Sequence, residues 1–403
     1  MSILDRPQQR TVPTNDAEVR PGARRPCAER VGRADPLLTS ALVLEIADPR
    51  SSCERVGVEI ESFCFTRRGD RLPFRGIGSM SEVVENLNAA IGARPTLSGS
   101  SVVGGEGPCG SISLEPGGQL EWASPPSRSF DDLTRSLASW ASTRDRVLGA
   151  LGVVSSDCAV DWEGECGECW PPKPRYEHMR RRYADRGARA LTPMQKTASV
   201  HLSFDYFSER DWRMKFRGIL SAIPASVVLF SNSAASVIGE RYANTRNLLW
   251  AQFDPCRTRL PDEAFGHGFD IQAYAEWVAA MPDLTPDLPR PADVRACAAE
   301  KLGEVFTPLR SKHLLELRTQ DRVPDSEIPR VVEFWAGLLY NADALQELLV
   351  LSEWFQSRSD WERVFAEACV SGSEAGGWLA DYTTEVMRIS RAGQRENAYL
   401  GTV

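Results

Sequence analysis

The chain has 403 residues, of which 42% are hydrophobic and 25% charged, and its formal net charge is −8. These proportions are typical of a globular protein with a sizeable core, and the negative charge argues against non-selective nucleic-acid binding, which depends on a surplus of Lys and Arg. No apolar run reaches the length of a membrane helix, and the N-terminus lacks an apolar secretory core. We therefore expect a cytoplasmic protein with no membrane or nucleic-acid partner.

The 10 cysteines are scattered along the chain, which favours reduced thiols over a disulfide framework. Only Cys166 and Cys169 form a close pair, in the run C-G-E-C. A structural zinc site would need a second such pair or two suitably spaced histidines, and neither follows closely. A zinc site, a redox-sensitive pair and a plain loop all stay open for this segment.

Residues 1–35 are rich in Arg, Pro and Ala without apolar periodicity, which predicts a disordered leader ahead of a single domain over residues 36–403. A helix is expected from Pro36. In ERVGVEIESFCF, Val56, Val58 and Ile60 alternate with Gly57, Glu59 and Glu61, as in a half-buried strand. The Ser- and Gly-rich segment 97–110 is predicted to be a mobile loop.

Further along, SISLEPGGQLEWAS predicts two strands joined by a Pro-Gly-Gly bend, and a helix is expected from Ser129. Residues 157–174 read as irregular, TASVHLSFD as a strand, and Ser208 with Asp211 as a helix-starting capping box. Residues 312–318 predict a strand and residues 325–403 mainly helices. Hairpins followed by separate helices predict an α+β fold with a largely antiparallel sheet.

Carboxylates recur on the polar faces of these predicted strands. Glu59 and Glu61 are two residues apart and project the same way, and Glu115 and Glu121 flank the Pro-Gly-Gly bend. A solvent-exposed face explains any one strand, but these faces offer acids, His201 and small hydroxyls in place of the usual Thr and Lys. If the acids meet in one cleft, divalent cations would offset their repulsion, and Mg²⁺ would share them with phosphate groups.

Five segments in order, RVGVEIESFCF, SISLEPGGQLEWAS, TASVHLSFD, FSNSAASVIGERYANTRNLLWAQFDPCRT and KHLLELR, resemble the plant-type and actinobacterial branch of the glutamate–cysteine ligase family. The resemblance spans roughly residues 50–320. It implies a glutamine-synthetase-like core, in which a curved antiparallel sheet forms a funnel for ATP, metal ions and amino acids. The segment RYEHMRRRYADRG resembles the bacterial branch that makes γ-glutamylcysteine.

The resemblance also implies roles for individual residues. It implies Mg²⁺ ligation by Glu59, Glu61, Glu115, Glu121 and Glu316. Arg318 would face the γ-phosphate of ATP, and Arg246 would bind a carboxylate or phosphate. Three further residues match substrate-binding positions: Met194, Asn232 and Ser233. His201 could ligate a metal, contact ATP or be a satisfied sheet histidine.

The implied reaction joins the γ-carboxylate of glutamate to an amine, with cysteine as the family's usual acceptor, through an acyl phosphate. The chain departs from the family where it has ARALTPMQKT, keeping only Met194 of a Met-containing run, and where Thr319, Gln320 and Asp321 replace Gly-Ala-Asp. These changes leave another amine or acid donor open. An inactive relative acting as a binding protein, or a metal-dependent hydrolase, are the remaining alternatives.

Overall fold

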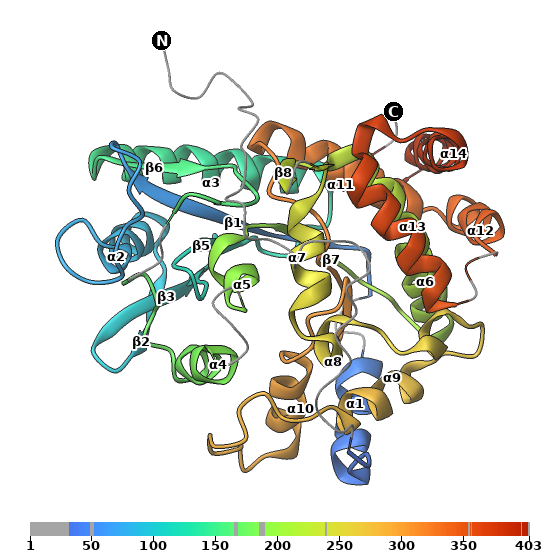
Figure 1. Ribbon diagram of the computed structural model, residues 1–403, viewed down its shortest axis with the longest axis horizontal. Coiled ribbons are helices and arrows are strands. Elements are labelled where there is room, and N and C mark those ends of the chain that lie inside the picture. Colours follow the sequence, from blue (N-terminus) through green and yellow to red (C-terminus); the bar gives the residue numbers. More distant parts are fainter. Residues whose placement is uncertain are drawn as a thin grey trace.

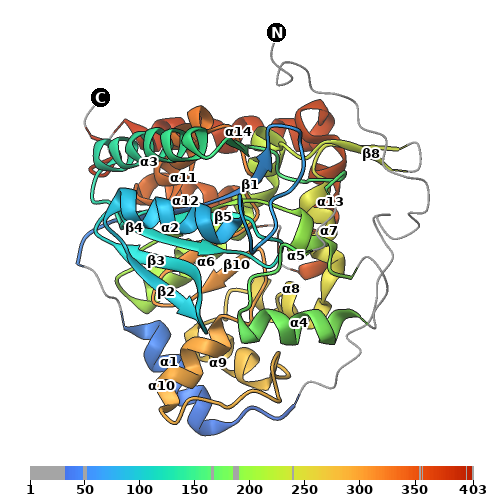
Figure 2. The same cartoon turned by 90° about the vertical axis from the view of Figure 1, so that its left-hand side faces the viewer.

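The computed structural model describes residues 32–48, 52–164, 168–184, 190–237, 240–353, 355, 357–395 and 397–401. In this part of the chain an antiparallel sheet crosses the molecule and helices surround it (Figures 1 and 2), which is the α+β arrangement expected from the sequence. Residues 1–31, which make up most of the predicted leader, lie outside the described residues. The single-domain organisation stays a prediction.

The main sheet runs in the order β10–β11–β7–β1–β5–β4–β3–β2, and β6 pairs with the end of β1. All of these pairs are antiparallel. The strands are β1 Val56–Thr66, β2 Arg94–Ser98, β3 Ser101–Gly107, β4 Gly110–Leu114, β5 Leu120–Ala123, β6 Val153–Ser156, β7 Val200–Phe204, β10 Leu309–Ser311 and β11 Leu315–Leu317, with a separate hairpin of β8 Ala235–Val237 and β9 Glu240–Tyr242.

The central strand β1 has the alternation that its sequence predicts. Val56, Val58 and Ile60 are at most 3% exposed and belong to the core. Glu59 and Glu61 project from the opposite face of the strand, because successive side chains of a strand alternate. The predicted strand over 312–318 is real but shorter, since β11 covers only Leu315–Leu317.

Helices cover the sheet and extend beyond it (Figures 1 and 2). The α-helices are α1 Pro36–Ala47, α2 Met80–Ile91, α3 Phe130–Ala150, α4 Pro174–Ala184, α5 Thr192–Lys196, α6 Glu209–Phe230, α7 Thr245–Phe253, α8 Pro255–Thr258, α9 Ile271–Ala280, α10 Val294–Leu302, α11 Ile328–Leu339, α12 Ala342–Leu351, α13 Arg358–Ser371 and α14 Gly377–Gln394. The long helix α6 packs against α11, α12, α13 and α14 on one side of the sheet. Figure 1 has these helices on its right.

Two predicted helix starts are observed with their caps. The side chain of Ser129 accepts a hydrogen bond from the Asp132 backbone N–H at the start of α3. Ser208 accepts one from the Asp211 N–H at the start of α6. Both satisfy a backbone N–H that has no partner inside its own helix, which fixes where the helix begins.

A buried tryptophan ties α6 to the hairpin β10–β11. Trp212 is fully buried, stacks on Phe216 and donates from Nε1 to Ser311 Oγ over 2.8 Å. The Ser311 backbone N–H donates in turn to the Tyr274 hydroxyl of α9 over 3.0 Å. These bonds hold the hairpin in place from behind.

Two expectations from the sequence are wrong. The segment 97–110 is not a mobile loop, because β2 and β3 pair through it and β3 also pairs with β4. Its glycines serve close packing: a Cβ at Gly104 would lie 2.5 Å from the Ile112 carbonyl oxygen, and one at Gly105 would overlap Asn88. Glycine-rich strands lack the side-chain alternation from which a strand is usually predicted.

The second correction concerns the thiols. Cys169 and Cys256 are disulfide-bonded, whereas the sequence favoured reduced cysteines throughout. Spacing along the chain does not reveal which cysteines a fold brings within bonding distance. Cys166, the other half of the C-G-E-C run, lies outside the described residues.

No helix in the described ranges combines the length and the apolar character needed to cross a bilayer.

The core makes a direct stability prediction. Leu202 on β7 is fully buried, whereas Leu44 on α1 is 57% exposed. Leu202→Ala should lower the free energy of unfolding by about 2–5 kcal/mol because it leaves a cavity in the central sheet. Leu44→Ala should change it by less than about 0.5 kcal/mol. Urea unfolding followed by circular dichroism measures both, and equal losses would contradict this description of the core.

Candidate active site

Neighbouring strands bring together acids that are far apart in the sequence. Glu61 on β1 pairs with Glu121 on β5, and Glu59 pairs with His201 on β7. On the other side of β7, Glu316 of β11 pairs with Ser203. Because paired residues point to the same face of a sheet, the register alone places these groups on one surface.

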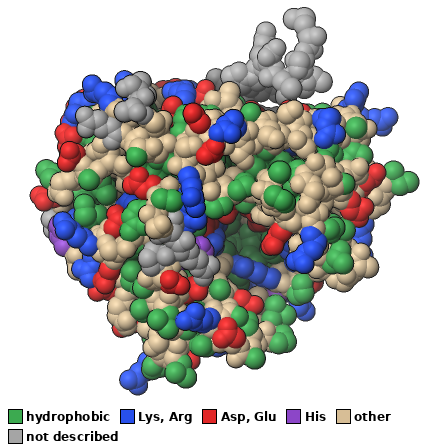
Figure 3. Space-filling model, turned by 180° about the vertical axis from the view of Figure 1, so that it is seen from behind, with side chains coloured by type: hydrophobic (Ala, Val, Ile, Leu, Met, Phe, Trp, Pro, Cys, Tyr) green, Lys and Arg blue, Asp and Glu red, His purple; other side chains and the backbone are tan. Residues whose placement is uncertain are grey.

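This surface lines a cavity of about 340 Å³, which we call the acidic cavity. Acidic and basic side chains both line it, together with one histidine: Glu59, Glu61, Glu115, Glu121, Arg175, Arg246, Arg310, Lys312, Arg318 and His201. Its wall also includes Met194, Trp250 and Phe306. Figure 3 shows the molecule from behind, where a hollow with hydrophobic side chains in its depth has charged side chains around its edge.

A chain of hydrogen bonds joins the acids of β1 through β7. Glu59 Oε2 lies 3.1 Å from His201 Nδ1, and His201 Nε2 lies 2.8 Å from Ser199 Oγ. Ser199 donates to Glu61 Oε2 from its hydroxyl over 2.6 Å and from its backbone N–H over 2.7 Å. These contacts fix the orientation of both glutamates and of the imidazole.

Glu316 sits at the basic end of the cluster. It is 1% exposed and lies behind the wall of the cavity. Its Oε1 accepts from Arg310 and from Arg318, both over 2.5 Å, and its Oε2 lies 2.8 Å from Lys312 Nζ. A buried carboxylate with three cationic partners is fully compensated.

Electrostatics therefore differ between the two ends of the cluster. Burial disfavours the charge of Glu316, but Arg310, Lys312 and Arg318 hold its pKa well below the usual value. At the other end, burial and then Glu115 raise the pKa of Glu61 to about 7. Burial and the same neighbour raise the pKa of Glu121 well above its ordinary value. Arg246 and Arg318 offset part of the effect at Glu61, but neither Glu61 nor Glu121 has the direct ion pairs that Glu316 has.

Histidine 201 stands between the two ends. Burial, and then the nearby Arg318, lower its pKa to about 4, so the imidazole is neutral near pH 7. Burial also works against ionisation of Glu59, but the hydrogen bond from His201 brings the pKa of that carboxyl below its usual value. A neutral imidazole has one lone pair that can ligate a metal, but here Nδ1 lies against Glu59 and Nε2 against Ser199, so a bound metal would replace one of these contacts.

The donor set fits divalent cations. Two groups have ligand atoms within 4.8 Å of one another: Glu59 with His201 and Glu316, and Glu61 with Glu121 and His201. Hard carboxylate oxygens suit Mg²⁺, and a cation would offset the repulsion that raises the pKa values of Glu61 and Glu121. Because a neutral imidazole has a single free lone pair, His201 would serve one of the two groups at a time.

Glu115 lies in the cavity but in neither group. Its Oε1 accepts a hydrogen bond from the Tyr176 hydroxyl of α4 over 3.2 Å. The Lys173 ammonium lies near it, bonded to the Leu114 carbonyl oxygen over 2.8 Å. Glu115 therefore links the bend after β4 to α4, and its role as a metal ligand stays a prediction.

A buried aspartate lies close to Arg246 at the N-terminus of α7. Asp321 is fully buried, and its Oδ2 accepts from Ser233 Oγ over 2.7 Å and from Asn244 Nδ2 over 3.1 Å. Its Oδ1 lies 4.0 Å from Arg246 Nη1, and Arg246 Nη2 donates to the Arg318 carbonyl oxygen over 3.0 Å. This network places Arg246 directly beside Arg318.

The positions of the predicted substrate contacts differ. Arg246 and Met194 line the acidic cavity. Asn232 and Ser233 do not line it. Asn232 Nδ2 donates to the carbonyl oxygens of Asp157 and Arg322. The Asn232 backbone N–H and the Ser233 hydroxyl both donate to Asp321. They support Arg246 from behind, at positions where a substrate in the cavity would not touch them.

Sequence reasoning missed several residues of the site: Ser199, Tyr176, Trp250, Phe306, Arg310 and Lys312. Arg310 lies in β10 and Lys312 directly follows that strand. Arg310 meets Glu316 only through the register of the β10–β11 hairpin. Ser199 shares the polar face of β7 with His201, so its position was a usable signal. The aromatic residues gave no signal, since most aromatic side chains in this chain belong to the core.

Comparison with known proteins identifies the family. The family model described as glutamate–cysteine ligase family 2 (GCS2) matches residues 55–401. The chain belongs to this family. The predicted enzyme class, an ATP-dependent ligase, is thereby confirmed.

The individual relatives are distant in sequence, but their matches cover most of the chain. The chain is 25% identical over 406 residues to the chloroplastic glutamate–cysteine ligase of Brassica juncea, a match that covers 93% of this chain and 78% of the relative. It is 26% identical over 412 residues to the chloroplastic enzyme of Arabidopsis thaliana, covering 93% and 77%. The relatives are named chloroplastic, and a cytoplasmic location for this chain stays a prediction.

A solved structure supports the fold. The crystal structure of the glutamate–cysteine ligase of Francisella tularensis, in complex with AMP, matches with a TM-score of 0.51 at 12% identity, covering 86% of this chain and 79% of that chain. This likeness concerns the fold alone, and it agrees with the predicted ligase-type antiparallel sheet.

Metal binding is testable without any substrate. Adding MgCl₂ should raise the melting temperature, because a ligand that binds only the folded state stabilises it by about 2.7 kcal/mol at a hundredfold excess over Kd. In Glu121→Gln this rise should shrink, while the metal-free variant should be at least as stable as the wild type, because a neutral amide replaces a repelled carboxylate.

The matched control is Glu106→Gln on β3, where the side chain is exposed and away from the cavity. It should keep the full response to MgCl₂ in differential scanning fluorimetry. An equal response in Glu121→Gln would remove Glu121 from the metal site.

Proposed function

We propose that this ligase joins the γ-carboxylate of glutamate to the amine of an amino acid, with ATP and Mg²⁺, through a γ-glutamyl phosphate. L-Cysteine is the acceptor to which the names of the relatives point. The observation that carries the proposal is that two groups of side chains able to hold a metal ion meet Arg318 and Arg246 at one cavity, with only Glu316 behind its wall.

The acids would hold Mg²⁺ and, through it, the phosphates of ATP. The first group is Glu59, His201 and Glu316, and the second is Glu61, Glu121 and His201. Bound Mg²⁺ would neutralise charge on the phosphate oxygens as the phosphoryl group moves. Since the protein's own cations already surround Glu316, the less compensated pair Glu61 and Glu121 has the greater need of a metal ion.

Arg318 and Arg246 would have separate roles in binding the substrates. Arg318 is held by Glu316 over 2.5 Å and lines the cavity, so its guanidinium is fixed beside the metal groups, where charge develops on the transferred phosphoryl group. Arg246 is buried beside it, and its planar guanidinium suits the α-carboxylate of glutamate. A rigid guanidinium pair of this kind contributes by positioning as well as by charge.

In the first step the γ-carboxylate oxygen of glutamate attacks the γ-phosphorus of ATP, and ADP leaves with the electron pair of the broken P–O bond. In the second, the acceptor amine attacks the acyl carbon and phosphate leaves. The α-ammonium of the acceptor must lose a proton before its nitrogen can attack. The products are the γ-glutamyl amide, ADP and phosphate.

The decisive experiment measures phosphate release from ATP. Release should require MgCl₂, glutamate and an amine together, and mass spectrometry of the products should find a γ-glutamyl amide. Metal-dependent hydrolysis of an amide in the absence of ATP would point instead to a metal-dependent hydrolase. Absence of release over a panel of carboxylates and amines would point to a binding protein instead.

A single substitution tests the role of Arg318. Arg318→Lys keeps the charge but loses the planar pair of donors, so kcat should fall by about a hundredfold or more, with a much smaller change in KM for ATP. Arg330→Lys, on the exposed face of α11, is the matched control and should retain activity. A loss confined to KM would assign Arg318 to ground-state binding.

A further inference from the structure

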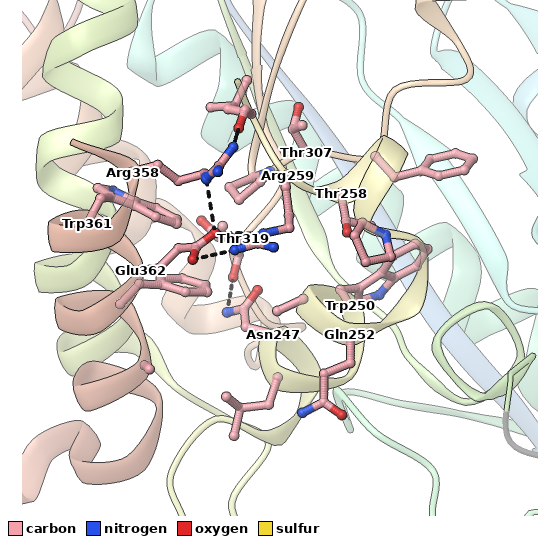
Figure 4. A pocket seen from close by; sticks show the side chains of 18 of the residues that line it. Asn247, Trp250, Gln252, Thr258, Arg259, Thr307, Thr319, Arg358, Trp361 and Glu362 are labelled. Carbon is pink, nitrogen blue, oxygen red and sulfur yellow. Dashed lines mark hydrogen bonds and ion pairs between the residues drawn. The ribbon is translucent and has the colours of Figure 1, made fainter. Parts of the chain in front are cut away.

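A second cavity of about 370 Å³ lies beside the acidic cavity, between α7–α8 and the helix α13 (Figure 4). We call it the side cavity. Its walls are largely aromatic and aliphatic, from Trp250, Phe265, Phe306, Trp361 and Phe365. This volume lies in the range of small-molecule sites and exceeds what the side chain of cysteine would fill.

Four side chains line both cavities: Arg246, Trp250, Phe306 and Arg318. The side cavity therefore adjoins the acidic cavity where Arg246 and Arg318 lie. None of the glutamates of the acidic cavity, nor Lys312, lines it. Because Arg318, which the proposed function places at the transferred phosphoryl group, lines both cavities, the side cavity adjoins the place where the acyl phosphate would form and its acceptor would arrive.

Two buried polar groups in its wall have no hydrogen-bond partner within the described part of the chain. They are Arg246 Nε and Thr319 Oγ1, and each of these residues is 3% exposed. Buried polar groups are nearly always satisfied, because an unsatisfied one is costly. The lining closes over both atoms in this structure, so a polar ligand group would reach them only with a shift of the lining side chains.

The lining is strongly cationic. It holds five arginines, Arg246, Arg259, Arg318, Arg358 and Arg363, against the single acid Glu362. Glu362 is already engaged: it accepts from Arg259 over 2.7 Å and 2.6 Å, and Arg358 Nε lies 3.8 Å from it (Figure 4). Behind this wall Glu316 and Asp321 already offset part of the charge of Arg318 and Arg246, and the guanidinium N–H groups of the lining suit a ligand with a carboxylate or another anionic group.

We propose that the side cavity binds the acceptor, an amino acid whose apolar or aromatic side chain is larger than that of cysteine. This inference rests on the proposed function. The apolar body packs among Trp250, Phe306 and Trp361, the carboxylate meets the arginine-rich wall, and the amine faces the acidic cavity across Arg318.

The reaction balances without any further reagent. The acceptor ammonium loses one proton to solvent, and its nitrogen lone pair forms the C–N bond at the acyl carbon. The C–O bond to phosphate breaks with its electron pair on the departing phosphate, which takes up the second proton from nitrogen. Thr319 and the aromatic wall only bind and orient the acceptor.

The test compares acceptors in the ATP-, Mg²⁺- and glutamate-dependent phosphate-release assay with the full chain. L-Phenylalanine and L-tryptophan should exceed L-alanine and L-cysteine in kcat/KM by about tenfold or more, a span typical of discrimination by an apolar pocket. Phenethylamine, which lacks the carboxylate, should be a poorer acceptor than L-phenylalanine.

Ala366→Trp fills the side cavity from α13, where Ala366 lines it. It should lower kcat/KM for the bulky acceptors by about tenfold and alter that for L-cysteine by less than about twofold. Glu367→Trp, at the next and exposed position of α13, is the matched control and should behave as the wild type. Thr319→Val keeps the shape but loses the unpartnered hydroxyl, so KM for the bulky acceptors should rise by about three- to tenfold.

Different failures have different meanings. Absence of release with every amine overturns the proposed function itself. Release that is fastest with L-cysteine, and indifferent to Ala366→Trp and Thr319→Val, overturns only the role of the side cavity. A rise in KM for ATP alone in Ala366→Trp would assign the cavity to the nucleotide and likewise overturn the proposal.

Discussion

Repulsion between buried carboxylates is the constraint on which the rest of the site depends. Strand pairing places Glu59, Glu61 and Glu121 on one surface, and the adjoining strand adds Glu316. Such a cluster is unfavourable unless positive charge accompanies it. The protein supplies most of that charge at one end, through Arg310, Lys312 and Arg318 on Glu316.

Because this compensation is unequal, the two ends of the acidic cavity differ in their electrostatics. The Glu316 end is paired with the protein's own cations, while burial and neighbouring acids raise the pKa values of Glu61 and Glu121. His201 connects the two ends and stays neutral, which lets it donate to Glu59 or ligate a metal without adding charge. The phosphates of ATP bound with Mg²⁺ would contact Arg318 at one end, and at the other end the metal ion would join them to Glu61 and Glu121.

The supports of this arrangement lie in the surrounding helices. Trp212 of α6 and Tyr274 of α9 hold Ser311, and so fix the hairpin that carries Glu316. Asp321 holds the start of α7, from which Arg246 reaches the cavity. Arg246 also borders the side cavity, so one buried guanidinium connects the acidic cavity with an aromatic space that the chemistry of phosphate transfer does not require.

The sequence by itself determined the family, the strands β1, β4, β5 and β7, and the acids that they carry, because alternation along a strand and the Pro-Gly-Gly bend are local properties. It did not reveal β2 and β3, whose glycines hide the alternation, nor the disulfide-bonded state of Cys169. The tertiary structure alone decided which acids are compensated, since Arg310 reaches Glu316 only through hairpin register. It alone placed Asn232 and Ser233 behind Arg246 and opened a cavity beside it, because contacts between distant segments depend on packing, which local sequence patterns do not encode.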